Sequence, residues 1–240
     1  MKPFLNFVRL PQNTFIHQQL VWEEALLRTD ERNWCLINQG SSPAIVLGIS
    51  GNAEVLVNHQ KLLEKPIPVI RRFSGGGTVV VDENTLFVTL ICQHNALNLH
   101  PYPQHIMQWT AQKLYQPLLC PFSFELKEND YALQGKKWGG NAQSIIKNRW
   151  LHHSSLLWDY CPEKMEYLHM PAKTPAYRQK RSHADFLCRL ESYFPQQETF
   201  LGELIQQLEM HFDLKIAGLE EVEEIATRPH RKSTRIEGRC

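Results

Sequence analysis

Two arginines and three consecutive glycines lie directly before a run of β-branched residues in RRFSGGGTVVVD, residues 71–82. Glycine has no Cβ atom, so backbone N–H groups in such a run can approach an anion closely. Arg71 and Arg72 add planar, permanently charged groups that match phosphate or carboxylate oxygens. The segment predicts an anion-binding loop that receives a nucleotide, although a tight β-turn beside two surface arginines would have the same composition.

Two common nucleotide-binding motifs do not describe this loop. No Gly-Lys-Ser/Thr sequence follows the glycines, as a P-loop requires. The GxGxxG motif opens a helix, whereas TVVVD is typical of a strand. A positive charge for the phosphate chemistry must therefore come from elsewhere in the chain.

A second glycine cluster, GKKWGGNAQS at residues 135–144, contains a lysine pair. On a strand Lys136 and Lys137 point to opposite faces, so at most one of them enters a shared site. A lysine in that site would neutralise charge that develops on phosphorus or on an acyl oxygen in a transition state. Alone, the pair is typical of a solvated strand edge; together with the first glycine loop it indicates an active-site lysine.

The segments before the first loop alternate between helix and strand patterns. Residues 13–28 have apolar positions at helical spacing, with Asn13 or Thr14 as the N-cap. Strands are expected at 34–40 and 43–48, and a helix over 53–65 should stop before Pro66.

The segments around and after the loop are richer in strands. Strands are predicted at 69–73, 77–82 and 85–92, the last two joined as a hairpin at the DEN sequence. A helix contains Ile106, Trp109 and Leu114. Residues 129–159 read as a strand meander with turns at Gly135 and Asn148, and the chain from Pro162 onward as mostly helical. Hairpins rather than regular βαβ repeats predict an α+β fold with a mixed β-sheet flanked by helices.

The composition is that of an ordinary globular protein, with 42% hydrophobic and 21% charged residues among 240. A net charge of +1 argues against a large nucleic-acid footprint, and no apolar run is long enough to span a membrane. The N-terminus lacks the pattern of a secretory signal. The six cysteines have no CxxC spacing, which favours reduced thiols and a cytoplasmic protein over a zinc site or disulfide framework. We therefore expect neither nucleic acid nor membrane as a partner.

The two glycine clusters and WLHHSSLLWD, residues 150–159, occur together in an order that resembles the lipoate–protein ligase A family. The resemblance spans about residues 10 to 190 and implies the biotinyl/lipoyl protein ligase catalytic-domain fold. In that family the arginine–glycine loop wraps lipoyl adenylate, and a lysine contacts both the acyl carbonyl and the α-phosphate. The matching positions are Arg72 in the loop, Gly77 to Val80 as the ATP-contacting run, and Lys137 as the lysine.

The resemblance thus implies a set of site residues around the catalytic Lys137. Asp130, next to Asn129, is a candidate Mg²⁺ contact or merely a turn residue. Gln143 and His152 could line the pocket or be structural. Trp22, Val46 and Leu47 are expected in the core rather than along a lipoyl tunnel. The residues predicted to bind the substrates are Arg71, Arg72, Ser74, Gly75, Gly76, Gly77, Thr78, Val79, Val80, Asp130, Gly140, Asn141 and His153.

The implied reaction has two steps. ATP and lipoate, with Mg²⁺, give lipoyl-AMP and pyrophosphate, and a lysine of an acceptor protein then takes the lipoyl group as an amide. The implied acceptors are the lipoyl domains of 2-oxoacid dehydrogenase complexes or the glycine cleavage H protein.

The domain organisation expected from the resemblance is one catalytic domain over residues 1–240. Its core covers about 10–190, followed by a helical extension at 191–228 and a solvated tail at 229–240, without a separate C-terminal accessory domain. A separate accessory subunit is therefore a possible partner. The IEGR sequence in the tail also matches a protease-cleavage tag, and Val81 stands where the family often has histidine.

Two alternatives stay open. The first is an octanoyl or lipoyl transferase that moves the acyl group between proteins through a cysteine thioester. Cys120 is the candidate, but the family alignment places the transferase cysteine at Phe122, so a buried structural thiol is the favoured interpretation. The second alternative is a non-catalytic lipoate-binding protein, which would have no need for the arginine, glycine and lysine positions.

Overall fold

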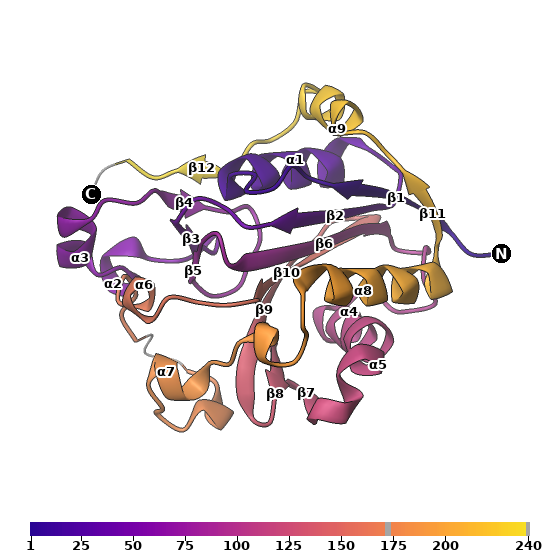
Figure 1. Ribbon diagram of the computed structural model, residues 1–240. Coiled ribbons are helices and arrows are strands. Elements are labelled where there is room, and N and C mark those ends of the chain that lie inside the picture. Colours follow the sequence, from indigo (N-terminus) through magenta and orange to yellow (C-terminus); the bar gives the residue numbers. More distant parts are fainter. Residues whose placement is uncertain (171–173, 239–240) are drawn as a thin grey trace.

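The computed structural model describes residues 1–170 and 174–238 and is built around an eight-stranded sheet (Figure 1). The strand order is β11-β1-β2-β6-β10-β9-β8-β7. β1 pairs in parallel with β2 and β11, and all other neighbours are antiparallel. The strands are β1 (Phe4–Arg9), β2 (Trp34–Gln39), β6 (Thr85–Gln93), β7 (Phe124–Lys127), β8 (Asp130–Leu133), β9 (Lys136–Ile145), β10 (Arg149–Leu157) and β11 (Asp213–Ile216).

A smaller sheet has the order β12-β4-β3-β5 and is also mixed, because β3 pairs in parallel with β4 and antiparallel with β5. Its strands are β3 (Ala44–Leu47), β4 (Val69–Arg71), β5 (Val79–Val81) and β12 (Arg235–Ile236). Mixed sheets flanked by helices confirm the predicted α+β class.

The predicted hairpin at the DEN sequence is wrong. β5 pairs with β3, whereas β6 pairs with β2 and β10 in the large sheet. The turn is real, since the Thr85 amide donates to the Asp82 carbonyl at 3.0 Å, but it carries the chain from one sheet to the other. β6 is an apolar run buried along almost its whole length, so a central position in the large sheet suits it better than a hairpin.

Helices cover both faces of the large sheet (Figure 1). Trp34 and Leu36 pack in a cluster with α1 and α9, while the alternate residues Cys35 and Ile37 pack in the cluster that includes α4, α5 and α8. No helix in the described segments is long and apolar enough to cross a membrane. The helices are α1 (Ile16–Thr29), α2 (Ala53–Leu56), α3 (His59–Glu64), α4 (Pro103–Thr110) continued by a π-helical turn (Ala111–Tyr115), α5 (Gln116–Leu119), α6 (Pro162–Met165), α7 (His183–Phe186), α8 (Gln197–His211) and α9 (Leu219–Ala226), with 3₁₀ turns at Cys120–Phe122, Ala176–Arg178 and Leu190–Ser192.

The start of α1 differs from the prediction. Neither Asn13 nor Thr14 caps the helix, and the Ile16 amide donates instead to the hydroxyl of Ser41 at 3.0 Å. A residue 25 positions further along the chain therefore supplies the cap. The helix predicted over residues 53–65 is divided at Val57, which bridges to Leu168.

The strand meander of residues 129–159 is confirmed, since β8, β9 and β10 are antiparallel neighbours. Gly135 turns the chain with a φ of +73°, a conformation that favours glycine. The chain after Pro162 is only partly helical as predicted. β11 lies within the predicted helical extension and adds a parallel strand beside β1.

The C-terminal segment also differs from the predicted solvated tail. The amides of Ser233 and Thr234 donate to the Glu24 carboxylate at 2.9 to 3.0 Å. β12 pairs with β4, and Glu237 forms an ion pair with Arg71. These contacts hold the segment along the edge of the small sheet.

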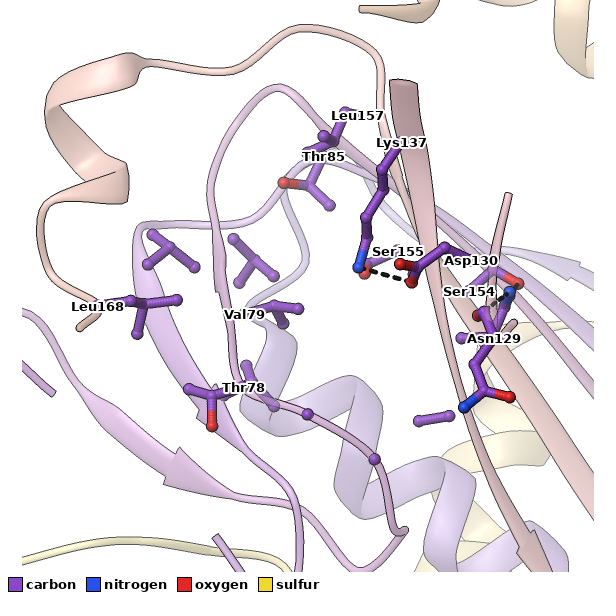
Figure 2. A pocket seen from close by; sticks show the side chains of 18 of the residues that line it. Thr78, Val79, Thr85, Asn129, Asp130, Lys137, Ser154, Ser155, Leu157 and Leu168 are labelled. Atoms are coloured by element: carbon purple, nitrogen blue, oxygen red, sulfur yellow. Dashed lines mark hydrogen bonds and ion pairs between the residues drawn. The ribbon is translucent and has the colours of Figure 1, made fainter. Parts of the chain in front are cut away.

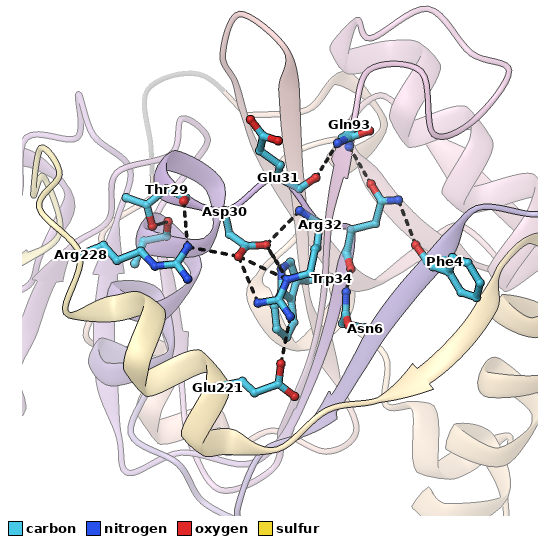
Figure 3. A network of polar contacts seen from close by, with 12 residues as sticks. Phe4, Asn6, Thr29, Asp30, Glu31, Arg32, Trp34, Gln93, Glu221 and Arg228 are labelled. Carbon is cyan, nitrogen blue, oxygen red and sulfur yellow. Dashed lines mark hydrogen bonds and ion pairs between the residues drawn. The ribbon is translucent and has the colours of Figure 1, made fainter.

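A charged network fixes α9 at the corner where α1 leads into β2 (Figure 3). The Asp30 carboxylate accepts hydrogen bonds from Arg32, from the Trp34 indole and from Arg228, and Arg32 also pairs with Glu221 at 2.9 Å. Burial opposes ionisation of Asp30, but the hydrogen bonds from Arg32 and Trp34 lower its pKa overall. The C-terminal helix is thereby held against the sheet.

Candidate active site

A cavity of about 600 Å³ lies between α1, the small sheet, the glycine loop and strands β9 and β10 (Figure 2). Lys137 and Asp130 lie on one side of it, and Thr78 and Val79 lie on the opposite side. Its wall has more apolar than polar surface, with aliphatic and aromatic side chains from the helix, the small sheet, β6 and the segment after β10. Such a site can enclose an apolar chain next to a charged group.

Lys137 is the central charged group of the cavity. Its Nζ lies 2.8 Å from the Asp130 carboxylate, and the Tyr177 hydroxyl donates to the other oxygen of that carboxylate at 2.9 Å. Burial and the neighbouring Asp130 raise the pKa of Tyr177, so this phenol stays protonated and donates. Lys136 is exposed and does not line the cavity, as the alternation of a strand predicts.

The two glycines of β9 make room for this arrangement. A Cβ atom on Gly140 would lie 3.2 Å from the Lys137 Nζ, and one on Gly139 would lie 2.9 Å from the side chain of Leu156. Gly140 therefore leaves space for the Lys137 side chain, and Gly139 permits close packing of β9 on its neighbours.

Arg72 organises the glycine loop from inside the protein. Only 4% of the residue is exposed. Its guanidinium donates to the carbonyls of Gly75 and Gly77, both at 2.8 Å, and its Nε donates to the Ser74 hydroxyl at 2.9 Å. Burial lowers the pKa of Arg72 to about 10, which leaves it protonated at neutral pH. Arg72 therefore holds the loop backbone so that the carbonyls of Gly75 and Gly77 point toward its buried guanidinium.

The middle glycine is the one that the loop geometry requires. Gly76 has a φ of +102°, and a Cβ atom there would lie 2.7 Å from the Arg72 Nη2. Nothing lies within 4 Å of a Cβ built on Gly75 or Gly77. Gly76 and Gly77 are exposed, and within the described residues their amides donate no hydrogen bond. These amides are available to an anion in the cavity.

A buried chain of hydrogen bonds connects α1 to the loop. The His153 Nδ1 donates to the Glu23 carboxylate at 2.7 Å, and its Nε2 is hydrogen-bonded to the Ser74 hydroxyl, 2.9 Å away. The same pattern activates the serine of a nucleophilic triad. Here Ser74 is 1% exposed, does not line the cavity and also accepts from Arg72. The chain therefore positions Arg72 rather than creating a nucleophile.

The structure brings most of the predicted site residues to one cavity and leaves three outside it. Arg71 faces away from the cavity, where it pairs with Glu237 and donates to the Gly51 carbonyl at 2.6 Å. Ser74 and Gly75 belong to the loop segment but do not line the cavity. The predicted residues on the cavity wall are Arg72, Gly76, Gly77, Thr78, Val79, Val80, Asp130, Lys137, Gly140, Asn141 and His153.

Two of the residues considered for the pocket belong to the protein interior instead. His152 is buried among Tyr131, Thr110 and Gln143, and burial lowers the pKa of His152 to about 3. The side chain of Gln143 donates to the Pro103 carbonyl and does not line the cavity. Val46 is buried in a core cluster, as expected, and it also lines the cavity.

Sequence reasoning missed the cavity residues that come from distant segments. Gln19 and Leu20 reach the wall from α1, and Arg178 and His183 reach it from residues 174–187. The helical spacing of α1 identified an apolar face but not what that face covers. The segment around Arg178 had no recognisable pattern.

Cys120 is exposed on the 3₁₀ turn Cys120–Phe122, so the interpretation of this residue as a buried thiol is wrong. It does not line the cavity. The turn that carries it lies between α5 and β7, and its thiol is directed to the Pro117 carbonyl. Among the described residues no cysteine lines the cavity that contains the Lys137 amine.

The sequence and the fold define the class of the protein. The family model of the lipoyl protein ligase A/B catalytic domain matches residues 16–213, and the chain belongs to this family. The finding confirms the predicted family.

Individual relatives agree with this assignment. The chain is 33% identical over 190 residues to an inactive lipoate–protein ligase 2 from Plasmodium falciparum, and the match covers 65% of this chain. It is 31% identical over 165 residues, 67% of its length, to a probable lipoate–protein ligase A from Mycoplasma genitalium. The chain spans about half the length of these relatives, 49% and 48% respectively.

Solved structures share the fold at lower sequence identity. A lipoate–protein ligase A solved with bound ATP superposes with a TM-score of 0.73 at 15% identity, and the match covers 94% of this chain and 93% of that one. A Thermoplasma acidophilum protein solved with bound lipoic acid gives a TM-score of 0.73 at 16% identity over the same shares of the two chains. These neighbours confirm the predicted biotinyl/lipoyl protein ligase fold.

Proposed function

We propose that this protein is a lipoate–protein ligase that makes lipoyl-AMP from lipoate and ATP and transfers the lipoyl group to a lysine of an acceptor protein. The observation that carries the proposal is the position of Lys137, whose amine lies in the same cavity as the exposed glycine loop and an apolar wall, across from Thr78 and Val79. An acyl chain and a nucleotide phosphate that meet in this cavity would both lie within reach of one ammonium group.

In the first step a lipoate carboxylate oxygen bonds to the α-phosphorus of ATP, and the bond to pyrophosphate breaks. The exposed amides of Gly76 and Gly77 bind phosphate oxygens, and Lys137 stabilises the charge that develops on the phosphorus. Asp130 and Tyr177 hold the lysine in place before the substrates arrive. Arg72 keeps the loop in the shape that exposes its amides.

In the second step the amine of an acceptor lysine attacks the carbonyl carbon of lipoyl-AMP. The bond to AMP breaks, the amine loses a proton, and an amide forms. Lys137 stabilises the carbonyl oxygen as its negative charge develops. The apolar part of the cavity holds the acyl chain and excludes water from the mixed anhydride.

Mg²⁺ fits this site as an ion that arrives with ATP. Among the described residues no group of three or more metal-ligating side chains exists, but Glu128 and Asp130 are carboxylates on the cavity wall. Mg²⁺ is commonly held by one or two carboxylates together with substrate phosphates. When bound, the ion would neutralise charge on the phosphates, and Asp130 is the side chain nearest to Lys137 that could hold it.

The proposed acceptors are lipoyl domains of 2-oxoacid dehydrogenase complexes or the glycine cleavage H protein. A T. acidophilum neighbour with a TM-score of 0.72 comes from a structural analysis of a bi-partite lipoate protein ligase and its E2 lipoyl domain. That example supports a lipoyl-domain acceptor. It also supports the proposal that a second polypeptide takes part in the first step.

The test is to incubate the protein with an apo lipoyl domain, lipoate, ATP and Mg²⁺, and to measure acceptor mass and pyrophosphate. A parallel reaction supplies lipoyl-AMP directly, so that activation and transfer are separated. We expect Lys137→Ala to abolish the modification and Cys120→Ala to leave it unchanged. Transfer from an octanoylated carrier without ATP, lost in Cys120→Ala, would establish the transferase alternative.

Two further outcomes have defined meanings. Transfer from lipoyl-AMP without formation of lipoyl-AMP would show that activation requires a partner polypeptide. Binding of lipoate without modification in either reaction would establish the non-catalytic lipoate-binding alternative.

A further inference from the structure

Among the residues that the structure describes, three Arg or Lys side chains lie on the cavity wall, and two of them have partners. Lys137 is paired with Asp130 at 2.8 Å, and Arg72 donates to carbonyls of the glycine loop. The third, Arg178, forms no ion pair with a carboxylate in the described part of the chain. The Asp130 carboxylate acts to raise the pKa of Arg178, but its two oxygens already accept hydrogen bonds from Lys137 and Tyr177.

Arg178 is unusually buried for an arginine without a counter-ion. Only 5% of the residue is exposed, and its Nη2 has no hydrogen-bond partner among the described residues. Its Nε donates to the Arg181 carbonyl at 3.1 Å, and the guanidinium carbon lies 4.9 Å from the centre of the Phe186 ring. Burial lowers the pKa of Arg178. A buried charge of this kind is costly unless an anion accompanies it.

The surrounding backbone fixes this arginine close to the reacting groups. The Ala176 amide donates to the Glu128 carboxylate at 2.6 Å, and the Cys188 amide donates to the Lys137 carbonyl at 2.8 Å. Both ends of the segment that carries Arg178 are thus attached to β9 or to the turn before β8. The cavity that contains the Lys137 amine therefore also contains a cation without an ion pair among the described residues.

The missing anion has to keep its charge throughout the reaction. The carboxylate of an acyl substrate loses its charge when the mixed anhydride forms, whereas the phosphate remains anionic in ATP, in the acyl-adenylate and in AMP. A guanidinium also matches phosphate oxygens with two parallel donors. The geometry points to a phosphate group of the nucleotide as the counter-ion.

We propose that Arg178 is a phosphate ligand of the nucleotide, in addition to the glycine loop and Lys137. This inference rests on the proposed function, since it requires that the cavity bind a nucleotide. Arg178 enters the site from a segment some forty residues after Lys137 in the sequence, so binding of the phosphate also fixes that segment over the cavity.

The test compares ATP with adenosine, which has the same base and sugar but no phosphate. Isothermal titration calorimetry measures the affinity of wild type, Arg178→Gln, Arg178→Lys and Arg181→Gln for both compounds. Arg181 is the matched control, because it lies in the same segment with its guanidinium carbon 5.3 Å from the same ring, but it does not line the cavity. Thermal unfolding of each variant verifies that it is folded.

We expect Arg178→Gln to weaken ATP binding by about ten- to a hundredfold and to leave adenosine binding unchanged. Arg178→Lys should lose less, since it retains the charge but not the paired donors, and Arg181→Gln should bind ATP as wild type does. The inference is overturned if Arg178→Gln binds ATP normally, or if both glutamine variants weaken ATP and adenosine alike. If Arg178→Gln does not fold, the affinities of Arg178→Lys for ATP and for adenosine, compared with those of wild type, test the inference instead. Wild-type protein that binds no ATP would refute the proposed function itself.

Discussion

Replacement of Gly76 by alanine tests the structural account of the glycine loop most directly. Three adjacent glycines look equivalent in the sequence, but they differ in the structure. Gly76 has a φ of +102°, whereas Gly75 has a negative φ and open space around its Cβ position. We therefore expect Gly76→Ala to be damaging and Gly75→Ala to be tolerated.

The magnitude follows from two contributions. A non-glycine residue held in a sparsely populated backbone region costs about 1–3 kcal/mol. The new Cβ would also lie 2.7 Å from the Arg72 Nη2, which would have to give up one of its hydrogen bonds to the carbonyls of Gly75 and Gly77. Loss of one charged hydrogen bond adds about 1.5–3 kcal/mol. The expected loss of unfolding free energy is thus roughly 3–5 kcal/mol if the loop keeps its shape. Gly75→Ala should change it by less than about 1 kcal/mol, with a gain expected from the reduced entropy of the unfolded chain.

Urea unfolding by linear extrapolation measures the stability of the three proteins, and calorimetric titration with ATP measures the state of the loop. If Gly76→Ala relaxes by distorting the loop, stability will fall less, but ATP affinity will fall instead, because the Gly76 and Gly77 amides move. The reasoning is refuted if Gly76→Ala retains both wild-type stability and wild-type ATP affinity. It is also refuted if Gly75→Ala is equally harmful.

Three further predictions concern the groups around this loop. Glu23→Gln should cost about 1–3 kcal/mol of unfolding free energy, because the buried carboxylate accepts hydrogen bonds from His153, Thr89 and Gln19 and an amide would turn an N–H toward one of these donors. Urea unfolding of the variant and of wild type measures this loss, and an unchanged free energy of unfolding contradicts the prediction. Gly140→Ala should slow lipoyl-AMP formation by about ten- to a hundredfold with little loss of stability, since its Cβ would lie 3.2 Å from the Lys137 amine. Rapid-quench kinetics measures the rate of adenylate formation, and a wild-type rate would show that the new methyl group does not displace the lysine. The pKa of buried His152, about 3 against an ordinary 6.5, means that between these pH values the unfolded chain binds a proton that the folded chain does not. The free energy of unfolding should therefore fall as pH is lowered from 6.5, with His152 contributing up to about 1.4 kcal/mol per pH unit. In urea titrations at pH 7, 6 and 5, His152→Gln should reduce this pH dependence, whereas a substitution of exposed His105 should not.

The sequence by itself determined the features that depend on local chemistry. The strand alternation of GKKWGG predicted that only one of Lys136 and Lys137 could enter a site, and the order of the motifs predicted the family. The succession of strand and helix patterns predicted the mixed sheet. β-Branched and apolar runs identified most strands, because the side-chain period of a strand is a property of the backbone alone.

The tertiary structure decided which charges remain available to a ligand. Arg71 and Arg72 are adjacent and alike in the sequence, but Arg71 is paired with Glu237 on one side of β4, while Arg72 is buried behind the loop. Arg178 reaches the cavity from a segment without a recognisable pattern. Pairing in the folded chain depends on residues more than a hundred positions apart, and burial changes the cost of leaving a charge unpaired. Neither quantity is contained in local spacing, so only the fold shows that Arg178 is a cavity cation without an ion pair among the described residues.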